Sequence, residues 1–213
     1  MRDYSILHNG PSRSFPEGDP FLAGAGEGTD ILLLLGGSGS HVPGDASKAA
    51  ILVELDTECL GVHTGEASGG EGSNVLGFAR YRNGNDAPTN LIELVRQPAS
   101  DPAAIAAARA LFEAAGFEVV VCADQPGRIV DRLVRPKYNA ALRFLDEGLA
   151  SAQAMDMTCR MGLGYPDGPI ERVERGGLAR HHDVSKAIFE MTGHNSYMPA
   201  RRAVVAKARE DKP

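Results

Sequence analysis

The fold of the first half of this chain is decided by residues 91–123, which read LIELVRQPASDPAAIAAARALFEAAGFEVVVCA. Leu91–Arg96 and Phe117–Ala123 are short apolar runs typical of buried strands, and the alanine-rich segment between them has the composition of a helix. Asp101 is placed to cap that helix and Pro102 to occupy its first position. A strand, a helix and a strand at this spacing predict a βαβ unit within a largely parallel sheet.

Toward the N-terminus the sequence predicts more of the same sheet. Three further apolar runs, bounded by glycine, asparagine or aspartate, favour strands at Ile31–Leu35, Ala49–Leu55 and Asn74–Tyr81. Residues 1–29 are rich in proline and glycine and show no sustained periodicity, so we expect irregular chain there.

Toward the C-terminus the pattern becomes helical. Apolar residues keep helical spacing from Gly127 to Gly148, with Pro136 inside the pattern, where we expect a kink. Capping residues and glycines predict further helices near 151–161, 168–175, 177–192 and 199–210. The fold class predicted is therefore α/β plus all-α: an α/β domain over 1–124 followed by an all-helical domain over 125–213.

Composition excludes several classes of function. The chain has 213 residues and a net charge of −6, divided as −10 over residues 1–124 and +4 over 125–213. This balance offers no basic footprint for nucleic acid, and the longest apolar run is far too short for a membrane span. No secretory signal is visible, and three widely separated cysteines make no disulfide framework, so we expect a cytoplasmic protein. No histidine or cysteine spacing suggests a metal site.

Two longer motifs carry a resemblance to a known family. DQPGRIVDRLVRPKYNAALRFLDEGLAS (124–151) and GLGYPDGPIE (162–171) resemble the C-terminal helical domain of the 3-hydroxyacyl-CoA dehydrogenase family. LIELVR and GFEVVVCADQPG resemble the last strands of that family's nucleotide-binding domain. The resemblance implies a reduced Rossmann-like domain, a homodimer formed through the helical domain, an acyl-CoA ligand, and NAD-dependent interconversion of 3-hydroxyacyl-CoA and 3-ketoacyl-CoA.

The cofactor motif of that family is not found. Its members begin with a strand, a GxGxxG turn and a helix, because glycines let the backbone approach the pyrophosphate at the helix N-terminus. Gly24–Gly28 lacks a preceding strand, and Gly36–Gly39 lacks a following helix. We interpret both as loops, and NAD is expected from the resemblance alone.

The family's catalytic positions are only partly retained. The resemblance implies a histidine base held by a glutamate, and Glu93 fits the glutamate. The histidine position falls on Ala79, or on Arg80 or Tyr81 if the gap is shifted. The family's serine aligns with Thr57, and its asparagine aligns with Asp131.

Simpler interpretations of these positions stay open. Glu93 would be a surface residue at a strand end, Asp131 one partner of a helix ion pair with a flanking arginine, and Thr57 an ordinary loop hydroxyl. His181–His182 and His194 are expected to be solvated. An arginine cluster would meet CoA phosphates or form a solvated face; its members are Arg172, Arg175, Arg180, Arg201 and Arg202.

Two functions therefore compete. The chain is either an active, short NAD-dependent 3-hydroxyacyl-CoA dehydrogenase, or a degenerate member that binds acyl-CoA or supports a complete partner. The retained Glu93 favours the first function. The missing histidine and the missing glycine turn favour the second, which we prefer on chemical grounds.

Overall fold

The computed structural model describes residues 4–27, 30–38, 41–66 and 74–210. The chain divides into two compact units. The first comprises Met1–Arg82 and Pro88–Arg128, and the second comprises Asn83–Ala87 and Ile129–Pro213. The composition shift predicted a single boundary after residue 124, but it gave no sign that the 83–87 loop packs with the helical part.

A six-stranded sheet forms the centre of the first unit, and its strands lie side by side in chain order. All neighbours are parallel except β4 and β5, which are antiparallel. The fold class is confirmed, including the parallel pairing of β5 with β6 across the predicted βαβ unit. The strands are β1 (Tyr4–His8), β2 (Ile31–Leu35), β3 (Ala50–Glu54), β4 (Val75–Arg80), β5 (Leu91–Arg96) and β6 (Glu118–Ala123).

The expectation for residues 1–29 was wrong. Tyr4–His8 forms the edge strand β1, which pairs with β2 in register from Tyr4 opposite Ile31 to His8 opposite Leu35. Helix α1 (Pro20–Ala23) follows, with Asp19 accepting a hydrogen bond from the Phe21 amide at 3.0 Å. Of the five residues of β1 only Tyr4 is buried, because an edge strand needs little apolar periodicity, and the sequence pattern is correspondingly weak.

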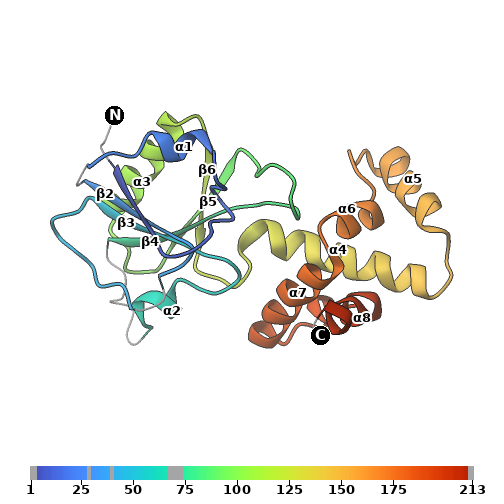
Figure 1. Ribbon diagram of the computed structural model, residues 1–213. Helices are drawn as coiled ribbons and strands as arrows, with labels where there is room; N and C mark the ends of the chain where they lie inside the picture. Colours follow the sequence, from blue (N-terminus) through green and yellow to red (C-terminus); the bar gives the residue numbers. More distant parts are fainter. Residues whose placement is uncertain (1–3, 28–29, 39–40, 67–73, 211–213) are drawn as a thin grey trace. The chain divides into compact units, whose positions relative to one another are not determined.

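The two faces of the sheet have separate apolar cores. Helix α3 (Pro102–Ala114) lies over one face together with α1 (Figure 1), where aromatic rings stack, with Phe15 4.5 Å from Phe21 between ring centroids. The other face packs against the short helix α2 (Gly61–Thr64) and the preceding Leu60, which is fully buried. These elements hold the ends of the strands in fixed positions.

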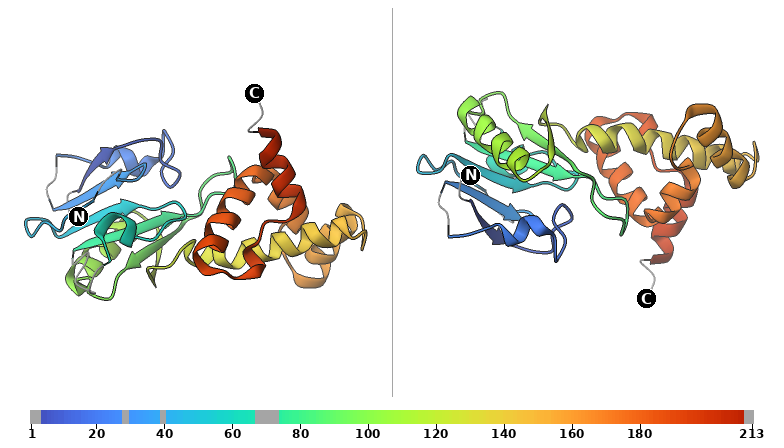
Figure 2. Two further views of the ribbon diagram at one scale, coloured as in Figure 1. Left: turned by 90° about the horizontal axis from the view of Figure 1, so that it is seen from below. Right: turned by 90° about the horizontal axis from the view of Figure 1, so that it is seen from above.

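The second unit is helical, and α4 is its longest helix (Figure 2). Tyr138 and Leu142 of α4 are fully buried against Ile170 and Val173 of α6. Pro136 lies inside α4, as the sequence predicts. No helix in the described part of the chain combines the length and apolarity that crossing a membrane requires. The elements are α4 (Arg128–Asp146), α5 (Ala152–Leu163), α6 (Pro169–Arg175), α7 (Leu178–Thr192), a 3₁₀ turn (Asn195–Tyr197) and α8 (Arg201–Glu210).

Candidate functional site

The carboxyl ends of β1 to β4 meet at one edge of the sheet, which is where open parallel sheets bind ligands. At this edge β5 runs back beside β4, and the register places Ala79 directly opposite Glu93. Directly opposed residues of an antiparallel pair have Cβ atoms about 4.5–5.5 Å apart. Glu93 is only 4% exposed, so the interpretation as a surface residue was wrong. A buried carboxyl group therefore faces a methyl group.

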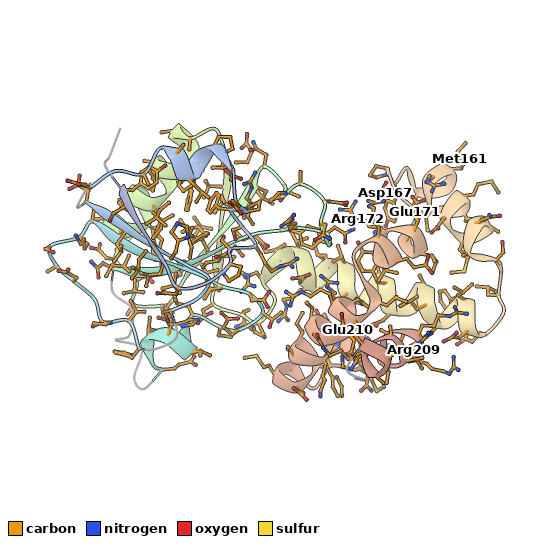
Figure 3. The ribbon with its side chains drawn as sticks, viewed as in Figure 1. Met161, Asp167, Glu171, Arg172, Arg209 and Glu210 are labelled. Carbon is orange, nitrogen blue, oxygen red and sulfur yellow. The ribbon has the colours of Figure 1, made fainter. Side chains whose placement is uncertain are left out.

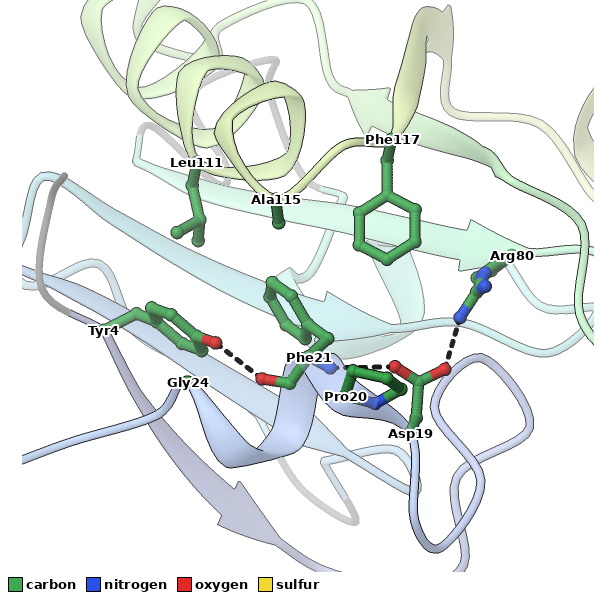
Figure 4. A pocket seen from close by; sticks show the side chains of 9 residues that line it. All are labelled: Tyr4, Asp19, Pro20, Phe21, Gly24, Arg80, Leu111, Ala115 and Phe117. Atoms are coloured by element: carbon green, nitrogen blue, oxygen red, sulfur yellow. Dashed lines mark hydrogen bonds and ion pairs between the residues drawn. The ribbon is translucent and has the colours of Figure 1, made fainter.

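Strand alternation separates Arg80, one of the two alternative positions for a histidine, from Ala79. Arg80 points to the opposite face from Ala79, into a pocket of about 390 Å³ under α1 and α3 (Figure 4). There its guanidinium lies 2.6 Å from the Asp19 carboxylate and 4.7 Å from the centroid of the Phe117 ring. Tyr81 follows the end of β4 and lies outside the Ala79–Glu93 pairing. Ala79 thus occupies the place across from Glu93.

The same pocket is closed off by local contacts. The Tyr4 hydroxyl donates to the Phe21 carbonyl at 2.6 Å, as Figure 4 shows. Burial, and to a lesser extent the Asp19 carboxylate, raise the pKa of Tyr4 above its usual value. The polar groups that line the pocket are therefore bonded to one another, and they support the packing of α1 on the sheet.

Thr57 and Asp131 differ in their surroundings. The Thr57 amide donates to Glu58 Oε2 at 3.0 Å, and its carbonyl accepts from the Gly127 amide at 3.0 Å, so the loop after β3 is firmly held. Asp131 lies in the second unit, where the Arg135 guanidinium is 2.6 Å away. The ion-pair interpretation of Asp131 is confirmed. The structure brings Glu93 and Thr57 to one edge of the sheet in the first unit, and it assigns Asp131 to the other unit.

The edge between β1 and β2 is where a dinucleotide pyrophosphate would need backbone donors. Here the buried Glu54 carboxylate occupies them: the Ser14 amide donates at 2.7 Å, the Gly36 amide at 2.8 Å and the Ser12 hydroxyl at 2.9 Å. The backbone of Gly10 packs so tightly on Gly36 that a Cβ on Gly36 would come within 2.6 Å of it. A phosphate entering here would meet the Glu54 carboxylate, so the described residues of this edge do not fit the cofactor.

Both glycine clusters behave as the loops that we expected. Gly24 ends α1, and Gly36 and Gly37 turn the chain after β2 with φ angles of 74° and 82°. Gly28 and Gly39 lie outside the described residues. Sequence reasoning did not find Glu54, because a glutamate at the end of an apolar strand gives no signal that its carboxylate turns inward.

Sequence reasoning did not identify His63 as part of this site. The structure places it at the same edge, with Nδ1 2.6 Å from Ser38 Oγ and Nε2 3.2 Å from Glu58 Oε1. The Asp124 carboxylate fixes the start of α2 by accepting from the amides of Leu60 at 2.7 Å and Gly61 at 2.9 Å. The residues of this cluster come from three separate segments, so no local motif could have revealed it.

Two thiols lie near this edge. Burial raises the pKa of Cys59 and that of Cys122 to about 11, with Asp124 raising the first further and Glu93 the second. Both are therefore thiols at neutral pH. In the described part of the chain, no group of three or more histidine, cysteine, aspartate or glutamate side chains is arranged to hold a metal ion.

The motif of residues 162–171 forms the turn between α5 and α6. Gly164 ends α5 in the left-handed region with φ of 68°, and Pro169 begins α6. The buried Asp156 carboxylate accepts from the Ile170 amide at 2.8 Å, in a space that a side chain on Gly168 would fill. The motif is thus explained by helix capping and close packing.

Charged residues lie on the outside of the same turn. Arg172 donates to Asp167 at 3.0 Å, and Glu171 accepts from both the Gly168 amide and Arg160 (Figure 3). Arg175 bridges Asp167 at 2.7 Å and Asp86 at 3.0 Å. Arg201 and Arg202 pair with Asp146, so four of the five clustered arginines are engaged by carboxylates of their own unit.

The expectation that His181 is solvated was wrong. Its side chain is buried, with Nε2 2.9 Å from Asn139 Oδ1 and Nδ1 3.3 Å from the Arg135 guanidinium. Burial, and secondarily the charge of Arg135, lower the pKa of His181 to about 3. His194 is exposed, as predicted.

Comparison with known proteins agrees with the geometry. Residues 127–211 match the 3-hydroxyacyl-CoA dehydrogenase, C-terminal domain family. Over 109 residues, or 51% of this chain, it is 31% identical to the 3-hydroxybutyryl-CoA dehydrogenase of Bradyrhizobium diazoefficiens. It is also 31% identical over 105 residues, or 49% of this chain, to human mitochondrial hydroxyacyl-coenzyme A dehydrogenase. These matches span 37% and 33% of the two relatives.

A solved structure extends the likeness to most of the fold. The (S)-3-hydroxybutyryl-CoA dehydrogenase of Ralstonia eutropha superposes with a TM-score of 0.70 at 21% identity. The superposition covers 85% of this chain and 66% of the other. The shared fold includes the sheet as well as the helices.

Proposed function

We propose that this chain, whose residues 127–211 match the 3-hydroxyacyl-CoA dehydrogenase C-terminal domain family, is a degenerate member of that family without NAD-dependent hydride transfer. Its role is to bind acyl-CoA or to support a complete dehydrogenase as a partner subunit. The placement of Ala79 opposite the buried Glu93 carries this proposal.

The chemistry of that pair explains the loss. Oxidation of a 3-hydroxyacyl group requires a base to take the hydroxyl proton while hydride leaves the neighbouring carbon. The resemblance implies a histidine at the position of Ala79, and a methyl group has no lone pair. Loss of a positioned general base costs on the order of 10²–10⁴-fold in rate.

The β1–β2 edge supports the same conclusion independently. NAD bound by family resemblance would place its pyrophosphate where the Glu54 carboxylate takes up the backbone donors of Ser14 and Gly36. Without an anchored pyrophosphate, the nicotinamide is not held within contact of a substrate carbon. We infer that the chain does not use NAD.

The test is NADH formation from 3-hydroxybutyryl-CoA and NAD by the purified wild-type chain, Glu93→Gln and Ala79→His. We expect no turnover from any of the three proteins. Ala79→His restores the base, but it leaves the cofactor site closed. Calorimetric titration with acetoacetyl-CoA and with NAD then separates the two ligands, and we expect binding of the first only.

The alternative, an active short dehydrogenase, is favoured by one observation, the burial of Glu93 at the expected position. Turnover of about one per second by the wild type that collapses in Glu93→Gln would establish it and refute our proposal. The same assay with a complete dehydrogenase present tests the partner role, which predicts a changed rate for that enzyme.

We also propose a homodimer formed through the second unit. Apolar side chains of α4 and α5 stay exposed there, including Leu133 at 70% and Met161 at 83%, the latter labelled on α5 in Figure 3. The family resemblance implies pairing through this domain. Sedimentation should give a dimer at micromolar concentration, and a monomer would contradict the proposal. With three free cysteines, the expected compartment is the reducing cytoplasm.

A further inference from the structure

A chain of hydrogen bonds joins Ser38, His63 and Glu58 at the carboxyl edge of the sheet. Ser38 Oγ lies 2.6 Å from His63 Nδ1, and His63 Nε2 lies 3.2 Å from Glu58 Oε1. Ser38 follows the Gly36–Gly37 turn at the end of β2, Glu58 follows β3, and His63 belongs to α2. All three belong to the first unit.

The surroundings hold each member in place. His63 is only 9% exposed, and its backbone carbonyl accepts a hydrogen bond from the Val42 amide at 2.7 Å. The imidazole therefore has little room to change its orientation. Glu58 Oε2 accepts from the Thr57 amide at 3.0 Å and Oε1 from the Asp56 amide at 3.3 Å, and these bonds hold the carboxylate beside His63. Ser38 is half-buried, and its hydroxyl lies within hydrogen-bond distance of the His63 imidazole.

This order of groups is that of a nucleophile, a base and an orienting carboxylate. In the neutral imidazole, one nitrogen donates and the other accepts. Donation from Nε2 to Glu58 leaves Nδ1 as the acceptor for the Ser38 hydroxyl. The nearby Cys59 does not compete as a nucleophile at neutral pH, because burial raises its pKa to about 11.

We propose that Ser38, His63 and Glu58 form a catalytic relay that transfers an acyl group from a thioester or activated ester to water. This activity goes beyond the proposed function and requires neither NAD nor Glu93. Ser38 is the nucleophile, His63 the proton acceptor and donor, and Glu58 a positioning residue.

The reaction balances with water as the only co-substrate. Ser38 Oγ forms a bond to the acyl carbon while its proton passes to His63 Nδ1, and the carbon–sulfur or carbon–oxygen bond of the leaving group breaks. The leaving thiolate or alkoxide takes that proton. Water then attacks the acyl-serine with His63 as the base, which releases the carboxylic acid and restores the Ser38 hydroxyl.

Covalent labelling tests the nucleophile. A fluorophosphonate should add once per chain, and peptide mass spectrometry should locate the adduct on Ser38. Ser38→Ala should abolish the adduct, while Ser196→Ala should not change it. Ser196 is a matched control because its hydroxyl lies 2.8 Å from Nδ1 of the exposed His194. No adduct on Ser38, or equal labelling in Ser38→Ala, would overturn the proposal.

Hydrolysis of p-nitrophenyl acetate and of acetyl-CoA tests the base. We expect His63→Ala to lower the rate of both by at least ~100-fold, and added imidazole to restore part of it, which a purely structural role would not allow. Glu58→Gln should lower the rate by about tenfold, and Glu58→Asp should recover most of it. A wild-type rate equal to that of Ser38→Ala, in protein shown to be folded by circular dichroism, refutes the relay.

Discussion

The turn between α5 and α6 and the carboxyl edge of the sheet differ in how closely they match the pattern that the family resemblance implies. The turn has the glycines, both prolines and the glutamate of the 162–171 motif. At the edge, Ala79 lies opposite Glu93, and the Glu54 carboxylate occupies the space between the loops that follow β1 and β2. The motif that carries the resemblance is therefore one that holds two helices together.

The difference follows from what each region must satisfy. At the turn, Asp156 bonds the amides at the start of α6, so a change at Gly168 would disturb two helices at once. At the edge, an alanine at the position where the resemblance implies a histidine leaves the β4–β5 pairing intact, because strand pairing depends on the backbone. The two regions are therefore held by different kinds of interaction, side-chain capping at the turn and backbone pairing at the edge.

The strongest test of this comparison is Gly168→Ala. Its Cβ would lie 2.2 Å from the Asp156 side chain, so the carboxylate must leave the amides of Ile170 and Glu171. We expect a loss of about 2–4 kcal/mol in the free energy of unfolding, measured by urea denaturation.

Gly162→Ala is the matched control, since nothing lies within 4 Å of its added Cβ and it sits inside α5. It should be neutral or stabilise by up to about 1 kcal/mol. In an Asp156→Ala background, Gly168→Ala should lose most of its effect. An equal cost in both backgrounds would show that the motif acts through something other than this contact.

Glu54→Gln tests the sealed edge of the first unit. An amide cannot replace a carboxylate that accepts from Ser12, Ser14 and Gly36, because its NH₂ group would face a donor. We expect a loss of about 1.5–3 kcal/mol on urea unfolding. The exposed Glu17→Gln is the control and should change little. If Glu54→Gln is equally neutral, the carboxylate does not hold this edge together.

The sequence predicted the elements that depend on local signals. Asp101 and Pro102 mark the start of α3, Ser151 that of α5, and apolar runs mark five of the six strands. The edge strand β1 was missed because pairing on a single side leaves most of its residues partly exposed.

The candidate site was predictable only where one segment decides it. Glu93 and Ala79 could be proposed as neighbouring positions because β4 and β5 are consecutive strands. The Ser38–His63 contact joins residues 25 positions apart, and the Ser14–Glu54 contact joins residues 40 positions apart. No residue type or spacing in the sequence indicates either contact. Burial of His181 was missed for the same reason, since its partners lie on α4.

The buried His181 predicts a pH dependence of the second unit. Its pKa is about 3 in the fold and about 6.5 in an unfolded chain, so the unfolded state binds more protons between these values. The contribution of neutral His181 to the free energy of unfolding is complete above about pH 6.5 and declines as the pH falls toward 3. Between pH 7 and 5 we expect a loss of about 1–2 kcal/mol in urea unfolding. His181→Gln should flatten that dependence, whereas His194→Gln should leave it unchanged; equal slopes in all three proteins would contradict it.

The smallest expected effects come from the helix caps, and they test whether local rules hold equally in both units. Asp101 accepts from the Ala103 amide at 2.8 Å in the first unit, and Ser151 accepts from the Ala154 amide at 3.2 Å in the second. Each carries one capping hydrogen bond at an exposed helix start, so Asp101→Ala and Ser151→Ala should each cost about 0.5–1 kcal/mol. Amide hydrogen exchange over the first turns of α3 and α5 measures the two losses separately. A cost several-fold larger in one unit would mean that the two units differ in local stability. The difference between the units would then not be limited to the carboxyl edge of the sheet.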